Sequence, residues 1–247
     1  MPSFAALRDR LNRSVQALGG SLVEAGSLED HPVLFLRAGA PAGRPLLVTA
    51  GIHGEEPAST LGFAEWLEHD AAGVLDRIAL TALPCLNPVG FERGTRGSRD
   101  CPDLNRKFDD ATFALTRIVT DALTERRFDL ATDLHEDSDF LGAYCYELKS
   151  GPPFLADRAL AAAAVHVPLS DGDPVGDFIT RQGVLRPDPV ARREAVRRGG
   201  GLPIGLWMYE RVAAHTITFE APGARPLPER IAATRAALQA AVAFLIQ

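Results

Sequence analysis

Apolar residues recur along this chain in two kinds of spacing, and the alternation of the two predicts strands and helices in turn. Short apolar runs bounded by glycine or proline indicate buried strands. Such strands are expected at residues 33–37, 46–50, 78–86, 129–135 and 214–220. Longer stretches with apolar residues three or four positions apart are typical of helices. These helices are expected at residues 3–18, 58–68, 111–126, 153–165 and 227–246.

Strands that alternate with helices predict an α/β fold, in which a mixed, mostly parallel twisted sheet carries helices on both faces. Residues from about 170 to 205 are rich in Gly, Pro, Asp and Arg and are expected to be irregular. No repeat or linker divides the chain, so residues 1–247 are predicted to form a single domain. Ligands of such folds bind at the carboxyl ends of the strands. Candidate chemistry is therefore sought there.

Net charge, cysteine spacing and the length of apolar runs indicate which partners and which compartment to expect. The formal net charge of −6 argues against general affinity for nucleic acid. The three cysteines lack CxxC spacing, which is typical of reduced thiols in a cytosolic protein. No apolar run approaches the ~20 residues of a membrane span, and the N-terminus lacks the apolar region of a signal peptide. The expectation is a cytoplasmic protein without nucleic-acid or membrane partners, and its oligomeric state stays open.

Two predicted strands end in residues that bind metals. His53 and Glu56 lie on the turn that leaves the strand 46–50, and His135 ends the strand 129–135. Zinc in hydrolases is commonly held by two His and one Glu, with water in the fourth position. If the strands are neighbours, the three side chains converge, which favours metal-assisted hydrolysis. Alternatively, His53 is a hydrogen-bonded histidine at a helix start and Glu56 favours the positive end of the helix dipole.

A polar stretch between these motifs carries groups suited to anions. Asn105 and Arg106 stand side by side, and a guanidinium offers a fork of donors that matches a carboxylate. Asp103 could accept a hydrogen bond from the far nitrogen of His53, the contact that most metal-bound histidines make. The alternative is a polar loop with solvated arginines.

Glu220 closes the last predicted strand and shares one face of it with Thr216 and Thr218. A carboxylate at this place can act as the general base toward a metal-bound water. The alternative is an ordinary strand-end glutamate before a turn. The neighbouring motifs favour the catalytic interpretation.

Five motifs in one order carry a family resemblance. They are His53-Gly54-Glu55-Glu56, Asn87-Pro88-x-Gly90-Phe91, Asp103-Leu104-Asn105-Arg106, His135 and Thr218-Phe219-Glu220. Over about residues 46–223 the chain resembles the zinc carboxypeptidase superfamily, which includes metallocarboxypeptidases, succinylglutamate desuccinylase and aspartoacylase. The resemblance implies a zinc-carboxypeptidase-like (phosphorylase/hydrolase-like) domain with one zinc ion as its cofactor.

The resemblance also implies roles for single residues. His53, Glu56 and His135 resemble the zinc ligands, and Asp103 resembles the partner of His53. The other roles are a clamp for the substrate's terminal carboxylate (Asn105, Arg106), an oxyanion arginine (Arg96, with Arg99 as the alternative) and a general base (Glu220). The family's mobile tyrosine stands about twenty residues before that glutamate. Here Tyr209 is the nearest upstream tyrosine, eleven residues before it, so this role stays unassigned.

The predicted function is that of a zinc-dependent hydrolase that cleaves an amide bond next to a free carboxylate, foremost a metallocarboxypeptidase acting on small peptides. The alternatives are an N-acyl amino acid deacylase of the desuccinylase type and a non-catalytic homologue that binds carboxylates. Only 27 residues follow Glu220, where the desuccinylase branch usually carries a β domain, and this favours the peptidase. The acidic run at 136–139 is interpreted as a solvated turn, and the alternative is that it selects basic substrates.

Overall fold

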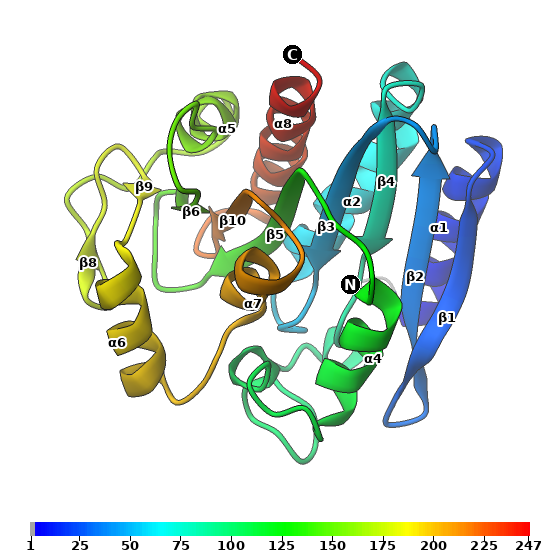
Figure 1. Cartoon of the computed structure of the whole chain (residues 1–247), viewed down its shortest axis with the longest axis horizontal. Coiled ribbons are helices and arrows are strands. Elements are labelled where there is room, and N and C mark those ends of the chain that lie inside the picture. Colours follow the sequence, from blue (N-terminus) through cyan, green and yellow to red (C-terminus); the bar gives the residue numbers. More distant parts are fainter. Residues whose placement is uncertain (1–2) are drawn as a thin grey trace.

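The apolar runs of the sequence become strands of a twisted eight-stranded sheet, and helices cover both of its faces (Figure 1). The computed structural model describes residues 3–247, so the first two residues of the predicted domain lie outside it. The strands of the sheet are β1 (Ser21–Leu28), β2 (His31–Gly39), β3 (Arg44–Ala50), β4 (Ile78–Leu83), β5 (Leu130–Asp137), β6 (Tyr144–Leu148), β9 (Val184–Leu185) and β10 (Thr216–Pro222). A separate small hairpin pairs β7 (Pro174–Val175) with β8 (Phe178–Ile179).

The strands follow the order β1-β2-β4-β3-β5-β10-β6-β9 across the sheet. The four central strands β4, β3, β5 and β10 are parallel, while β2 and β6 run antiparallel to their central neighbours. The central strands are buried on both faces, which explains their nearly continuous apolar runs. The predicted mixed, mostly parallel α/β sheet is therefore confirmed.

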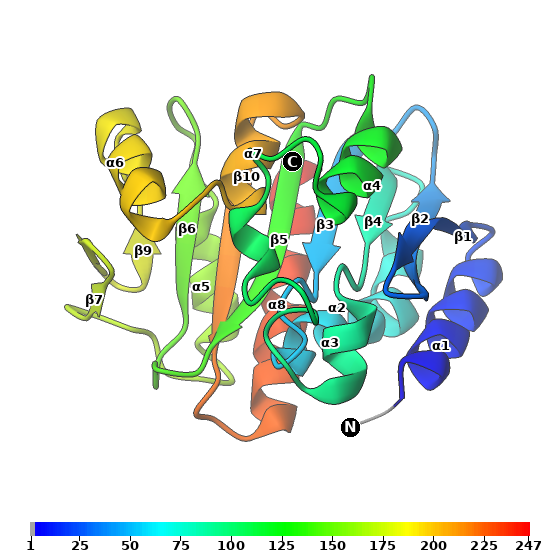
Figure 2. The ribbon, with the colours of Figure 1, turned by 90° about the horizontal axis from the view of Figure 1, so that it is seen from below.

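Two layers of helices cover this sheet (Figure 2). The helices are α1 (Phe4–Ala17), α2 (Pro57–His69), α3 (Pro88–Arg93), α4 (Ala114–Leu123), α5 (Ala156–Ala163), α6 (Pro189–Gly199), α7 (Ile204–Arg211) and α8 (Leu227–Leu245). One apolar core joins the sheet to α1, α2, α5 and α8, and a second joins its other face to α4 and α7. Among the described residues, no helix combines the length and the apolarity that crossing a membrane requires.

Several elements differ from the sequence prediction. The strand expected at 78–86 ends at Leu83, and the helix expected at 111–126 is shorter at both ends. The segment 170–205, expected to be irregular, contains β7, β8, β9 and α6. The pattern missed α6 because this helix buries no residue. It missed β1 because this edge strand pairs with β2 alone and buries only its last residue, Leu28.

Candidate metal centre

A cleft of about 600 Å³ opens at the carboxyl ends of the central strands. Seven of the eight residues proposed from the sequence line it: His53, Glu56, Arg96, Asn105, Arg106, His135 and Glu220. The eighth, Asp103, contacts His53 and Arg96 at its edge. The fold thus brings together side chains that are up to 167 positions apart in sequence.

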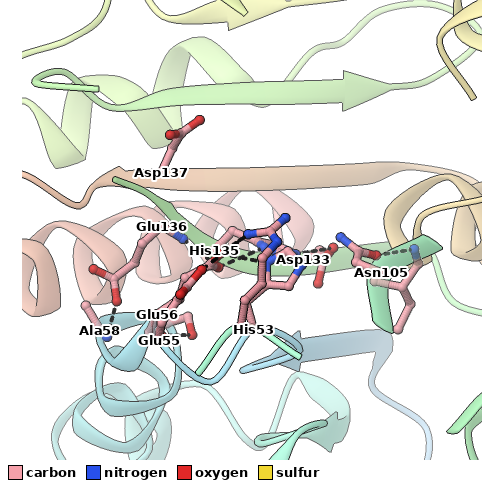
Figure 3. Close-up of polar contacts among 12 residues, drawn as sticks. His53, Glu55, Glu56, Ala58, Asn105, Asp133, His135, Glu136 and Asp137 are labelled. Atoms are coloured by element: carbon pink, nitrogen blue, oxygen red, sulfur yellow. Dashed lines mark hydrogen bonds and ion pairs between the residues drawn. The ribbon is translucent and has the colours of Figure 1, made fainter. Parts of the chain in front are cut away.

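His53, Glu56 and His135 meet because β3 and β5 are neighbouring parallel strands, with Ala50 paired to Leu134. The turn after β3 carries His53 and Glu56 to the side of His135 (Figure 3). Glu56 Oε1 lies 2.6 Å from His53 Nδ1, and Glu56 Oε2 lies 3.0 Å from His135 Nδ1. One candidate ligand atom from each of these buried residues lies within 4.8 Å of the other two.

The far nitrogen of each imidazole is held by a carboxylate. His53 Nε2 donates to Asp103 Oδ1 at 3.1 Å, and His135 Nε2 donates to Asp133 Oδ2 at 3.1 Å. Such contacts select the tautomer whose other nitrogen, here Nδ1, has a lone pair for a cation. Two imidazole nitrogens and a carboxylate are the donor set of catalytic zinc. The residues present therefore fit a metal ion, of which zinc is the typical one.

The charges of the centre keep the carboxylate of Glu56 in the state that a metal ligand requires. Burial alone would raise the pKa of Glu56, but the charges and hydrogen bonds of His135 and His53 lower it to about 2. Glu56 is therefore ionised at neutral pH, as a metal ligand must be. Burial raises the pKa of Glu220 well above its usual range. Such a shift increases the basicity of the carboxylate form, which is the form that accepts a proton in general-base catalysis.

Glu220 stands beside the histidines without taking part in their hydrogen bonds. It pairs with His135 in the parallel ladder of β10 and β5, so both side chains project from the same face of the sheet. Tyr144 on β6 is its partner on the other side. A row of His135, Glu220 and Tyr144 therefore crosses three strands at the floor of the cleft.

The structure separates the two arginines that the sequence left open. The Arg96 guanidinium lines the cleft, donates to Asp103 Oδ2 at 3.1 Å and approaches Glu56 Oε1 at 3.5 Å. Arg99 does not appear among the cleft-lining residues, and its backbone N–H donates to Glu29. Of the two arginines, only Arg96 therefore lies in the cleft beside the candidate ligands.

Asn105 and Arg106 form part of the wall next to α6 and α7. Asn105 Oδ1 accepts the backbone N–H of Ile204, the first residue of α7, at 2.8 Å. Arg106 donates only to carbonyl oxygens, those of Gly199 and Asn105. Within residues 3–247 no carboxylate forms a salt bridge with Arg106; the nearby Asp103 pairs with Arg96 instead, so the Arg106 guanidinium can still bind an anion.

Residues 42–246 match the family described as the succinylglutamate desuccinylase/aspartoacylase catalytic domain. The chain belongs to this family. Among solved structures, a candidate metallopeptidase from Shewanella denitrificans is 21% identical with a TM-score of 0.85, covering 98% of this chain and 90% of the other. A candidate metallopeptidase from Shewanella amazonensis is 26% identical with a TM-score of 0.79, covering 98% and 92%.

A more distant solved structure shares the fold. A metallo-carboxypeptidase from Pseudomonas aeruginosa is 20% identical with a TM-score of 0.64, covering 97% of this chain and 70% of the other. No curated protein matches the chain in sequence. The chain is a family member with the fold of carboxypeptidase-like hydrolases, and the resemblance seen in its motifs is confirmed.

The structure of this family member adds residues that its sequence did not single out. Asp133, two positions before His135 on the same strand face, holds that histidine and accepts a hydrogen bond from Thr49. Tyr144 and Tyr146 line the cleft, whereas Tyr209 lies under Arg192 on α6, with 5.1 Å between guanidinium and ring. The available signal in the sequence was the spacing of two positions, which puts Asp133 on the same strand face as His135 and Tyr146 on the same face as Tyr144.

The acidic run after His135 is not the solvated turn that was expected. Glu136 is only 4% exposed, and its carboxylate accepts from Ala58 and pairs with Arg230. Asp137 is half-buried and accepts from the Tyr144 hydroxyl at 2.6 Å. Only Ser138 and Asp139 are exposed. The prediction was wrong for Glu136 because its burial depends on α8, which lies far away in the sequence.

Proposed function

We propose that this protein is a zinc-dependent hydrolase that cleaves an amide bond next to a free carboxylate, and that it acts as a metallocarboxypeptidase. The observation that carries the proposal is the cleft itself. It holds the His53–Glu56–His135 group beside Glu220, and an unpaired Arg106 on its wall. A hydrolytic centre and an anion-binding group thus share one site.

Each side chain has a defined task in this reaction. Zinc, when bound, supplies a Lewis acid and lowers the pKa of water. Glu220 accepts a proton from the attacking water and passes it to the leaving amine. Arg96 donates to the oxyanion that develops on the scissile carbonyl. Asn105 and Arg106 bind the terminal carboxylate and so orient the bond to be cleaved.

The direct test of the base is Glu220→Gln. General-base catalysis contributes roughly 10²- to 10⁴-fold, so kcat should fall by about that factor. The zinc content measured by elemental analysis should stay at that of the wild type, since Glu220 makes no hydrogen bond to the candidate ligands. A Glu220→Gln enzyme that keeps near-normal turnover would show that another group is the base.

The second candidate is an N-acyl amino acid deacylase, which the matched family favours. Figure 3 places Asn105 to one side of His135 and Asp137 to the other. If the clamp holds the leaving amino acid, the acyl group extends toward Asp137 and Asp139, both of which line the cleft. These carboxylates repel an acyl chain that ends in a carboxylate, such as succinyl, and favour an acyl part that carries an amino group.

A panel of substrates separates the two candidates. Free dipeptides and tripeptides are compared with N-acetyl and N-succinyl amino acids that have the same leaving residue. The peptidase proposal expects kcat/KM to be highest for the peptides and lowest for the succinyl compounds. Faster cleavage of the N-acyl amino acids would favour the deacylase over the peptidase. Wild-type protein that binds no zinc would rule out both proposals.

A further inference from the structure

Helix α2 starts without the cap that its own sequence should provide. Glu56 is the N-cap residue, yet its side chain makes no capping hydrogen bond because both oxygens face the histidines. Pro57 follows and has no N–H. The N–H of Ala58 is therefore the first donor of the helix that needs a partner. That partner comes from another element.

Glu136 on β5 supplies the missing cap. Its Oε1 accepts the N–H of Ala58, and its own backbone N–H donates to Glu56 Oε2 at 3.0 Å. The residue next to one candidate ligand, His135, thus holds the segment that carries another, Glu56. Figure 3 shows these contacts on the side of His135 away from Asn105.

Arg230 on α8 completes the arrangement. Its Nη1 pairs with Glu136 Oε2, and both side chains are largely withdrawn from solvent. An isolated buried carboxylate is strongly unfavourable, whereas a paired and hydrogen-bonded one is tolerated. The negative charge also lies at the positive end of the α2 dipole. Glu136 is thus a fixed link between β5, α2 and α8.

We propose that Glu136, neutralised by Arg230, is a positioning residue of the metal centre. It holds the first turn of α2 against β5, so that the carboxylate of Glu56 stays between His53 and His135. This inference rests on the proposed function, because it requires that the three residues bind a metal. Loss of such supporting contacts typically weakens metal binding by 10- to 100-fold.

The chain contains a matched control for this residue. Glu147 on β6 is 3% exposed, accepts the N–H of Leu155 at the start of α5 and pairs with Arg186. Its burial, its arginine and its place at a helix start repeat those of Glu136. It is hydrogen-bonded to none of the candidate ligands, so its replacement reports the general cost of losing such a residue.

The decisive experiment measures zinc affinity by competition with a chromophoric chelator. The proteins are the wild type and the Gln, Asp and Leu variants at 136 and at 147, and melting of the metal-free forms is recorded in parallel. Gln keeps the length of the side chain and an oxygen for Ala58, whereas Asp keeps the charge but withdraws the oxygen by one carbon. The two substitutions therefore separate capping from charge.

The proposal expects Glu136→Gln to bind zinc within about threefold of the wild type, Glu136→Asp about tenfold more weakly and Glu136→Leu up to about 100-fold more weakly. All three Glu147 variants should keep the wild-type affinity even where they melt earlier. If Asp binds more tightly than Gln, Glu136 acts through its charge and the proposal is overturned. Equal affinities across both series would also overturn it. Wild-type protein that binds no zinc would instead remove the proposed function.

Discussion

Replacement of Gly54 by alanine should disable the metal centre without touching any candidate ligand. Gly54 stands between His53 and Glu56 where their turn passes close to α3. A Cβ atom at this position would lie 1.8 Å from the carbonyl carbon of Gly90 and 2.2 Å from the nitrogen of Phe91. Restoring a contact of 3.4 Å requires a displacement of about 1.6 Å. The obstructing atoms are backbone atoms and cannot rotate away.

The displacement falls on the turn, because α3 is well anchored. The side chain of Asn87 caps α3 by accepting the N–H of Gly90 at 2.8 Å, and Phe91 is 1% exposed in the core. A misplacement of about 1 Å in a catalytic site can reduce the rate about 100-fold, or roughly 2.7 kcal/mol. We therefore expect kcat/KM of Gly54→Ala to fall by at least about 100-fold, together with weaker zinc binding.

Chelator competition measures the affinity for zinc, and hydrolysis of the best substrate of the panel measures kcat/KM. Gly73→Ala is the matched control, because Gly73 is exposed and a Cβ there would meet no atom within 4 Å. This control should behave as the wild type in both assays. Gly54→Ala protein with wild-type zinc affinity and turnover would refute the argument that the close approach to α3 fixes the ligand turn.

Three further predictions follow from single side chains. Arg96→Ala should lower kcat by about 10²- to 10³-fold in steady-state assays, whereas Arg99→Ala should leave it unchanged; equal effects would reject Arg96 as the oxyanion donor. Arg106→Ala should raise KM for substrates with a free carboxylate and leave the weak cleavage of C-terminally amidated peptides unaltered. Burial opposes ionisation of Glu147, but hydrogen bonds from His215, Leu155 and Arg186 outweigh it and lower its pKa. The stability that the ionised Glu147 provides is present above about pH 4.5 and is lost as the pH falls. The free energy of unfolding, measured with denaturant between about pH 6 and pH 3, should therefore fall more steeply for the wild type than for Glu147→Gln.

The sequence predicts the candidate metal residues well because each follows an apolar run. His53 and Glu56 come directly after the strand residues 46–50, and His135 closes the run 129–135. Parallel strands place such positions at one edge of the sheet. What the pattern does not contain is the strand order, and only the pairing of β3 with β5 shows that the three residues converge. The fold class was therefore predictable from the sequence. The convergence of the three residues could be predicted only on the assumption that their strands are neighbours.

Other parts could not be predicted, because their state depends on distant residues. Glu136 reads as part of a polar turn, and it is buried only because Arg230, 94 positions later, neutralises it. Helix α6 has no apolar periodicity, since the face that it turns inward lines an open cleft rather than a packed core. For Glu136 the local pattern of charge is compatible with solvent exposure, and tertiary contacts decide the outcome.

The two sides of the cleft consequently differ in burial: one consists of buried elements and the other of an exposed helix. The candidate ligands sit on β5, in the turn after β3 and at the start of α2; β5 and α2 are buried on nearly every side and are tied together through Glu136. The opposite wall is α6, which buries no residue and contributes Arg192, Ala195 and Val196 to the cleft. Substitutions in the first group disturb packing as well as chemistry, whereas those in α6 replace no buried residue. Substrate preference can therefore change through α6 while the candidate metal centre stays intact.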